Sequence, residues 1–214
     1  VFTQNYQSDP ALSWQYFGSN LGIMRNFPAM SWDRNKTDTF YCRKRSWYIE
    51  TATCSKDVVI LLDNSGSMTG FRSYVARYTI KSLLGTFSNN DFINILSYSK
   101  STDDSIIPCF ADILVQATPD NINAFNEATK LLIPEGYANV TVALEKAFKL
   151  LEKYRDIRKC NESKSGCNQA IMLVTDGVPG NATEVFQKYN EYGNPNKSSP
   201  VRVFTYLLGK EVTK

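Results

Sequence analysis

The residues best suited to chemistry in this chain are oxygen-bearing side chains that follow an apolar run. Val58–Leu62 is typical of a buried parallel strand, and it leads directly into Asp63-Asn64-Ser65-Gly66-Ser67. Carboxylate and hydroxyl oxygens are the ligands that hard divalent cations prefer; Mg²⁺ favours six of them, and Ca²⁺ accepts more in a looser geometry. Asp63, Ser65 and Ser67 are therefore candidate ligands of Mg²⁺ or Ca²⁺.

A further oxygen donor follows a second apolar run. Ala170–Val174 ends in Thr175-Asp176-Gly177, and the carboxyl ends of parallel strands meet at one edge of a sheet. Asp176 is therefore expected beside Asp63, acting on the cation through a water molecule. A site with one carboxylate in direct contact leaves the cation electropositive and open to a carboxylate from another protein. The alternative is an ordinary polar turn at 63–67, because Asn, Ser and Gly are common turn formers.

Strands and helices alternate from Asp57 onward, which predicts an α/β domain over 57–214. We expect helices over 71–87, 118–133, 140–154 and 182–189, and strands over 92–98, 106–115, 171–174 and 201–207. The strand over 106–115 is interrupted by Pro108, and the helix over 71–87 has Tyr74, Val75, Tyr78, Leu83 and Leu84 as its apolar residues. This alternation predicts a mostly parallel sheet with helices on both faces.

Composition limits the function further. The chain has 214 residues, 43% of them hydrophobic, and a net charge of +3 from 24 basic and 21 acidic residues, so it has no nucleic-acid footprint. Its apolar runs are too short to cross a bilayer. Because the chain begins with Val1 and ends soon after the 201–207 strand, we expect an excerpt of a larger processed protein that lacks the last strand and helix of the domain.

Cysteines and glycosylation sequons favour a secreted protein. The odd number of cysteines predicts a free thiol or a bond to a segment outside this chain, and the lack of histidine and of Cys-x-x-Cys pairs argues against a structural zinc site. The cysteines are Cys42, Cys54, Cys109, Cys160 and Cys167, and the sequons begin at Asn35, Asn139, Asn161, Asn181 and Asn196.

Residues 1–56 differ in character, with many aromatic residues and no helical period. Within them, Arg45-Ser46-Trp47-Tyr48 resembles a signature of extracellular Cache sensor domains. In those domains the arginine binds an amino-acid carboxylate between aromatic side chains, for which a planar guanidinium is suited. We therefore expect a partial α+β, Cache-like segment ahead of the α/β domain, with Arg45, Trp47 and Tyr48 as candidate ligand-binding residues. The alternative is a solvated basic turn followed by a half-buried aromatic strand.

Taken together, Asp63, Ser65, Ser67 and Asp176 resemble the metal-ion-dependent adhesion site of a von Willebrand factor A domain, a Rossmann-like fold. Over nearly its whole length the chain resembles the alpha-2/delta auxiliary subunits of voltage-gated calcium channels. The matching segments are Trp14-Gln15-Tyr16-Phe17-Gly18, Arg45-x-Trp47-Tyr48-Ile49, Lys56-Asp57-Val58-Val59-Ile60-Leu61, Asp63-x-Ser65-Gly66-Ser67-Met68, Asp91-Phe92-x-Asn94, Leu114-Val115-Gln116-Ala117, Ile171-Met172-Leu173-x-Thr175-Asp176-Gly177, Phe186-x-Lys188-Tyr189-Asn190 and Val201-Arg202-Val203-Phe204-Thr205.

The resemblance implies a glycosylated protein at the extracellular face of the plasma membrane, anchored by regions outside this chain. It also implies binding to the pore-forming channel subunit, with an acidic residue on an extracellular loop of the channel completing the metal site, and increased surface abundance and current. By analogy with the family, Cys167 is the candidate for the disulfide to the delta segment; a local Cys160–Cys167 loop is the competing assignment. Arg45 matches the last basic residue of the family's amino-acid and drug pocket, whose other residues lie outside this chain.

One departure from the adhesion-site pattern concerns the loop after Gly136. Ala138 stands where a threonine ligand is usual, so Asn139, Thr141 or water is expected to substitute and the metal affinity to be reduced. Thr141 is equally well placed to be the N-cap of the next helix. Asn139 is also a sequon, and a glycan there would crowd the metal face, so we expect either an unmodified Asn139 or blocked docking.

Other classes of function fit the sequence less well. A serine nucleophile at Ser65 or Ser67 would need a base, and the usual histidine is absent. Asp63 as a phosphoryl acceptor would require a second acid two residues on, where Ser65 stands. A matrix or cell-adhesion domain and a Cache-type amino-acid sensor are the remaining alternatives to a channel subunit.

Overall fold

The computed structural model describes residues 1–29, 40–52, 54–99, 104–157, 168–177, 181–190 and 201–209. The chain divides into two compact units, Val1–Cys54 and Ser55–Lys214. In the described ranges, no helix combines the length and the apolar character needed to span a membrane.

The first unit contains a small hairpin between short helices. Helix α1 (Phe2–Ser8) precedes the antiparallel strands β1 (Gln15–Gly18) and β2 (Met24–Phe27), and the 3₁₀ turn η1 (Cys42–Lys44) leads into helix α2 (Ser46–Ala52). The half-buried aromatic strand that was the alternative for this segment is therefore wrong, because Ser46–Ala52 is helical. Packing explains the helix, because the Trp47 ring lies 4.7 Å from that of Tyr16 and a Cβ on Gly18 would come within 2.9 Å of Trp47. Such contacts override the strand propensity of Trp, Tyr and Ile.

The second unit is an α/β domain. In chain order its elements are β3 (Lys56–Asp63), η2 (Gly66–Met68), α3 (Phe71–Leu84), β4 (Phe92–Tyr98), β5 (Asp104–Ser105), η3 (Pro108–Phe110), β6 (Val115–Gln116), α4 (Pro119–Leu131), α5 (Val140–Ile157), β7 (Asn168–Thr175), α6 (Thr183–Asn190) and β8 (Arg202–Leu207).

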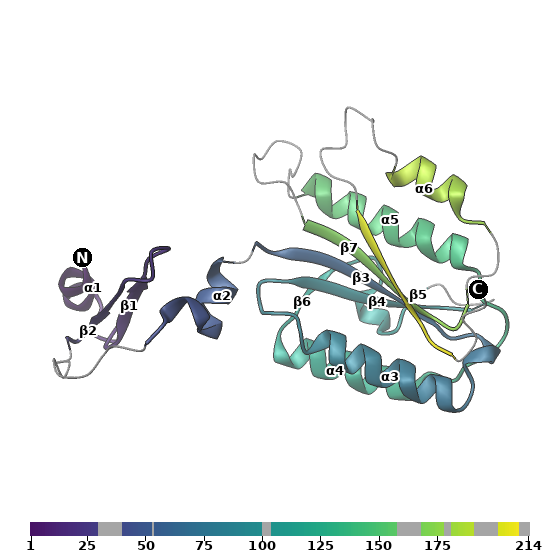
Figure 1. The fold of residues 1–214 in the computed structure, drawn as a ribbon, viewed down its shortest axis with the longest axis horizontal. Coiled ribbons are helices and arrows are strands. Elements are labelled where there is room, and N and C mark those ends of the chain that lie inside the picture. The colour runs from purple at the N-terminus through teal and green to yellow at the C-terminus, as the bar shows by residue number, and fades with distance from the viewer. Residues whose placement is uncertain are drawn as a thin grey trace. The chain divides into compact units, whose positions relative to one another are not determined.

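The sheet of this unit has the order β5-β4-β3-β7-β8, with β6 also paired to β4. Neighbours among β4, β3, β7 and β8 run parallel, whereas β5 and β6 run antiparallel to β4. Helices α3 and α4 cover one face and α5 and α6 the other (Figure 1). The predicted fold class is confirmed. The interruption expected at Pro108 is present as the turn η3, but most of 106–115 is not strand, because the flanking strands β5 and β6 are only two residues long each.

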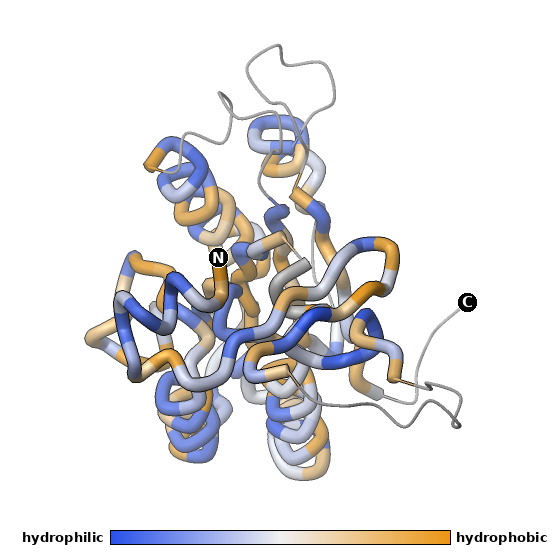
Figure 2. Tube along the Cα trace, turned by 90° about the vertical axis from the view of Figure 1, so that its left-hand side faces the viewer, coloured by the Kyte–Doolittle hydropathy of each residue, from blue (hydrophilic) through white to orange (hydrophobic). Residues whose placement is uncertain are grey.

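Strand β3 is buried on both faces because its side chains alternate between two halves of the core. Val59 and Leu61 pack in a cluster with residues of α5 and α6. Val58, Ile60 and Leu62 pack in a second cluster with residues of α3 and α4. Figure 2 shows hydrophobic and hydrophilic residues alternating along the helices, as expected for helices with one face on a sheet. The fully apolar run before Asp63 therefore positions this residue at the rim of a rigid central strand.

Helix α3 turns only part of its predicted apolar set to the core: Leu84 is buried and Leu83 packs against the core, but the two tyrosines do not. Its buried residues are Ala76, Ile80 and Leu84, spaced four apart along one stripe. Tyr74 and Tyr78 are 68% and 66% exposed. A tyrosine can cover apolar surface and keep its hydroxyl in water, so hydrophobicity alone did not identify the buried face.

The start of helix α5 shows which residue is its N-cap. The helix begins at Val140, and the Asn139 Oδ1 accepts a hydrogen bond from the Val142 N–H at 3.3 Å. Asn139 therefore occupies the cap position and Thr141 lies inside the first turn, so the prediction of Thr141 as the N-cap is wrong. Helix α4 starts as expected with Pro119 as its first residue, and the Thr118 side chain accepts from the Asn121 N–H.

Candidate metal-ion site

Two adjacent parallel strands bring the predicted oxygen donors together. Leu62 of β3 lies opposite Val174 of β7 in the ladder, so the residues that follow each strand reach the same edge. Asp63 and Ser65 are 3% and 4% exposed. Buried oxygens need hydrogen-bond donors or a cation, so their hydrogen bonds show how much capacity they keep for a metal ion.

The carboxylate of Asp63 is held by two donors. Its Oδ1 accepts from the Ser65 N–H at 3.0 Å, and its Oδ2 accepts from the Thr175 hydroxyl at 2.6 Å. Because each carboxylate oxygen has two lone pairs, both bonds leave capacity for a cation. Thr175 is completely buried and positions Asp63. The sequence pattern predicts Thr175 only as part of a strand end.

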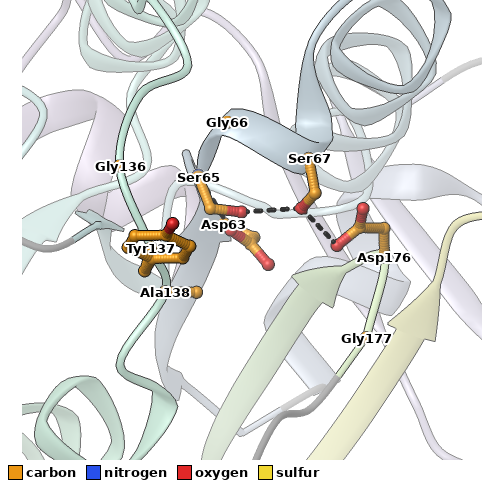
Figure 3. Close-up of a pocket in the computed structure, with 9 residues that line it drawn as sticks. All are labelled: Asp63, Ser65, Gly66, Ser67, Gly136, Tyr137, Ala138, Asp176 and Gly177. Carbon is orange, nitrogen blue, oxygen red and sulfur yellow. Dashed lines mark hydrogen bonds between the residues drawn. The ribbon is translucent and has the colours of Figure 1, made fainter.

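A continuous chain of oxygens crosses the rim (Figure 3). The hydroxyls of Ser65 and Ser67 lie 3.0 Å apart, and the Ser67 Oγ donates to the Asp176 Oδ1 at 3.0 Å. Neighbouring ligands in an octahedron with metal–oxygen distances of about 2.1 Å are about 3.0 Å apart. Ser65 and Ser67 therefore already stand at the spacing that two adjacent magnesium ligands need, and the donor set fits a hard divalent cation.

These side chains face a cavity of about 770 Å³. Its opposite wall is formed by the segment before α5, and Ala138 in that wall brings no side-chain oxygen. Neither Asn139 nor Thr141 is among its lining residues, so neither predicted substitute ligand stands there. The cavity is lined by Asp63, Ser65, Gly66, Ser67, Gly136, Tyr137, Ala138, Asp176 and Gly177 (Figure 3).

The two walls of the cavity are joined by backbone hydrogen bonds. The Gly66 N–H donates to the Gly136 carbonyl at 3.0 Å, and the Glu135 N–H donates to the Asn64 carbonyl at 2.9 Å. The Asn64 side-chain amide also donates to the Ile133 carbonyl at 2.9 Å. A Cβ on Gly66 would lie 3.4 Å from the Gly136 oxygen, at the close end of ordinary contact. The ligand loop is therefore fixed against the segment that leads into α5.

A tyrosine hydroxyl lies under the site. Tyr98 ends β4 directly opposite Asp63 in the ladder and is fully buried, and its hydroxyl lies near the side chains of Asp63 and Thr175. Burial, and next the charge of Asp63, raise the pKa of Tyr98 well above its ordinary value. Tyr98 therefore stays neutral next to Asp63 and adds no negative charge to the site.

An arginine that the sequence analysis did not consider also contacts the site. The Arg72 Nη1 donates to the Asp176 Oδ2 at 2.8 Å and to the Ser67 carbonyl at 3.3 Å. Two carboxylates, two hydroxyls and one guanidinium therefore define the charge of this rim. Within the described residues, no group of three or more His, Cys, Asp or Glu side chains forms a metal site. In this candidate site, serine hydroxyls supply the further oxygen ligands.

The remaining predicted residues are not among those that line the cavity. Arg45 belongs to the first unit, with its guanidinium carbon 4.5 Å from the centre of the Phe40 ring, and Trp47 and Tyr48 pack edge to face. Asn139 and Asn181 are exposed. Outside the described residues lie the sequons at Asn35, Asn161 and Asn196 and the disulfide candidates Cys160 and Cys167; Cys42, Cys54 and Cys109 are free thiols.

Comparison with protein families identifies two segments. A family model described as von Willebrand factor type A domain matches residues 58–178, more than half of the chain. A model described as VWA N-terminal matches residues 1–32. The first match contains β3, β7 and the whole oxygen-lined rim.

Curated relatives match along the whole chain. Human voltage-dependent calcium channel subunit alpha-2/delta-4 is 46% identical over 217 residues, covering 100% of this chain and 18% of that protein. The human alpha-2/delta-3 subunit is 42% identical over 215 residues, covering 99% of this chain and 19% of that protein. The chain thus spans less than a fifth of the length of these relatives.

Among solved structures, a von Willebrand factor type A protein from Catenulispora acidiphila aligns with a TM-score of 0.55 and 17% identity, over 71% of this chain and 33% of that one. At this level of identity the match supports the fold alone.

Proposed function

Because the chain belongs to the von Willebrand factor type A domain family and matches alpha-2/delta subunits along its length, we propose that it is part of an extracellular auxiliary subunit of a voltage-gated calcium channel. In this proposal it binds the pore-forming subunit and promotes surface expression and current. The role is binding and not catalysis. Regions outside this chain attach the protein to the membrane, and Cys167 forms the disulfide to the delta segment.

The observation that carries the proposal is the spacing of the rim oxygens. Asp63, Ser65 and Ser67 would hold Mg²⁺ or Ca²⁺ directly, and Asp176 would act through water. Bound there, the cation would supply a positive coordination position for a carboxylate of the partner. The residues themselves prepare this position, since Thr175 and the Ser65 N–H fix the Asp63 carboxylate and Ser67 links Ser65 to Asp176.

The composition of the donor set favours an acidic partner. With one carboxylate and two neutral hydroxyls in direct contact, a divalent cation would keep most of its charge. The cavity beside these donors is open to the partner, and its other wall carries the 81% exposed Tyr137 but no charged lining residue. An aspartate or glutamate on an extracellular loop of the channel fits this chemistry.

Co-purification of the pore-forming subunit with the full-length auxiliary subunit tests the proposal. We expect recovery to fall on adding EDTA, and the double variant Ser65→Ala/Ser67→Ala to show low recovery with or without the chelator. Ser82→Ala is the matched control, because Ser82 is an exposed serine on α3 outside the cavity lining. Recovery that is unchanged by both chelation and the double variant would contradict a metal-dependent interface.

A second pair of variants separates this function from amino-acid sensing. Asp63→Ala should abolish the divalent-dependent recovery, and Arg45→Ala should preserve it, because Arg45 lies in the other unit. The reverse result would favour the Cache-type sensor over the metal-dependent interface.

A further inference from the structure

Arg72 occupies an electrostatically unfavourable position on its own helix. It is the second residue of α3, whose first turn contains no acidic residue. The amino-terminal end of a helix carries partial positive charge, so a cation in this turn is disfavoured. Its ion pair with Asp176 at 2.8 Å compensates, and this contact connects α3 to the end of β7.

Both carboxylate oxygens of Asp176 are occupied by protein donors. Oδ1 accepts from Ser67, one of the proposed metal ligands, and Oδ2 accepts from Arg72. The Asp176 side chain is 10% exposed and the Arg72 side chain 46% exposed, so the arginine contacts the rim while part of it reaches solvent. Arg72 therefore neutralises one of the two acids that line the cavity.

The charge count shows what this pairing changes. Asp63 and Asp176 alone would balance a divalent cation and leave the loaded rim neutral. With Arg72 the loaded rim has a charge of +1, which the carboxylate of a partner brings to zero. The same guanidinium thus repels the cation in the free protein and attracts the partner once the cation is bound.

We propose that Arg72 is a specificity-determining residue of the metal face: it lowers the affinity of the free protein for Mg²⁺ or Ca²⁺ and raises the affinity of the loaded protein for an acidic partner. The proposal rests on the proposed function. Through Arg72, binding of the cation to the site and docking of the partner would each increase the affinity for the other.

The size of the effect follows from exposure. Water screens an ion pair in which one side chain is half-exposed. The interaction energy of such exposed pairs corresponds to a factor of about 1.4 to 5 in affinity. The cation is doubly charged, which doubles its interaction with the guanidinium. We therefore expect a change of about twofold to 30-fold in the affinity for the cation and of about 1.4-fold to fivefold in the affinity for the singly charged carboxylate of the partner.

The test compares Arg72→Gln with the matched control Lys81→Gln. Lys81 is an exposed cation on the same helix, nine residues on, or about 14 Å along the axis. Removing it changes net charge equally, at a distance where salt screens the interaction. Titration calorimetry with MgCl₂ measures cation affinity of the full-length subunit, and binding to the purified pore-forming subunit in saturating magnesium measures the partner affinity.

Arg72→Gln is expected to bind magnesium about twofold to 30-fold more tightly and the pore-forming subunit about 1.4-fold to fivefold more weakly, while Lys81→Gln changes neither. Arg72→Lys keeps the charge and should stay near wild type. Thermal unfolding confirms that each variant is folded. If the wild type binds both magnesium and its partner, two outcomes would overturn the role of Arg72 alone. One is that Arg72→Gln shifts both affinities in the same direction, and the other is that it shifts neither. Absence of magnesium binding by the wild type would overturn the metal site itself.

Discussion

Thr175→Val removes the hydroxyl that donates to Asp63 and accepts from the Gly177 N–H at 3.1 Å, and it leaves the shape of the side chain almost unchanged. Thr175 is fully buried, and its hydroxyl lies 2.6 Å from the Asp63 Oδ2 and 2.5 Å from the Gly177 carbonyl. It has one hydrogen to donate, and the charged carboxylate is the stronger acceptor. After the substitution Asp63 keeps the Ser65 N–H at its other oxygen, but Oδ2 loses its donor.

The expected cost is about 2 kcal/mol in the free energy of unfolding, because hydrogen bonds to charged groups contribute about 1.5–3 kcal/mol. For a protein of this size that corresponds to a decrease of about 4–8 °C in the midpoint of thermal unfolding. The matched control is Thr129→Val in α4. Thr129 is also buried, at 3% exposed, but its hydroxyl donates to a neutral acceptor, the Asn126 carbonyl, at 2.8 Å. Its loss should cost about 1 kcal/mol or less.

Urea unfolding in EDTA, followed by circular dichroism, measures both variants without a contribution from cations. A double-mutant cycle with Asp63→Asn isolates the pair, and we expect a coupling energy of about 1 kcal/mol or more between positions 63 and 175. A coupling energy near zero, together with equal costs for the two threonine variants, would refute the claim that Thr175 acts by holding the Asp63 carboxylate.

Three further predictions address the surroundings of the site. Tyr98→Phe should reduce the loss of stability above pH 10. Because the pKa of Tyr98 is raised in the folded protein, the unfolded chain loses this proton at lower pH, and the wild type loses up to about 1.4 kcal/mol of unfolding free energy per pH unit above pH 10. Urea titrations from about pH 9 to 11 measure the difference between the two proteins. Asn139→Ala should cost about 1 kcal/mol of unfolding free energy through loss of the α5 cap, and Thr141→Ala clearly less; equal costs would contradict the cap assignment. Gln169→Leu should cost about 3 kcal/mol in chemical denaturation, because it leaves the buried Arg155 guanidinium without the oxygen that it contacts at 3.0 and 2.7 Å; a neutral result would show that water reaches this arginine.

Local sequence patterns were sufficient to predict the central strands and their oxygen donors. The apolar run Val58–Leu62 can only be buried on both faces, and alternation with helices leaves few arrangements other than a parallel sheet. The strand ends at Asp63 and Asp176 follow from that arrangement. These positions depend on short-range patterns that tertiary structure did not override.

The missed features depend on contacts between distant segments. Arg72 and Asp176 are 104 residues apart, and a cation in the first turn of a helix gives no local reason to expect an ion pair. The helix at Ser46–Ala52 forms where Trp47 packs on the hairpin, against the strand preference of its own residues. The cap of α5 shifted by two residues, because both Asn139 and Thr141 can cap and packing of the helix decides between them.

The bonds that join Asn64 and Gly66 to the segment at 133–136 have an energetic consequence for filling the site. A loop that is already immobilised loses little conformational entropy when an ion arrives, so association is governed by stripping water from the ion and the oxygens. Amide hydrogen exchange at Gly66 and Glu135 should then be slow in chelator as well as in magnesium. A receptor preorganised in this way selects its ion by size and hydration and does not reshape itself around it.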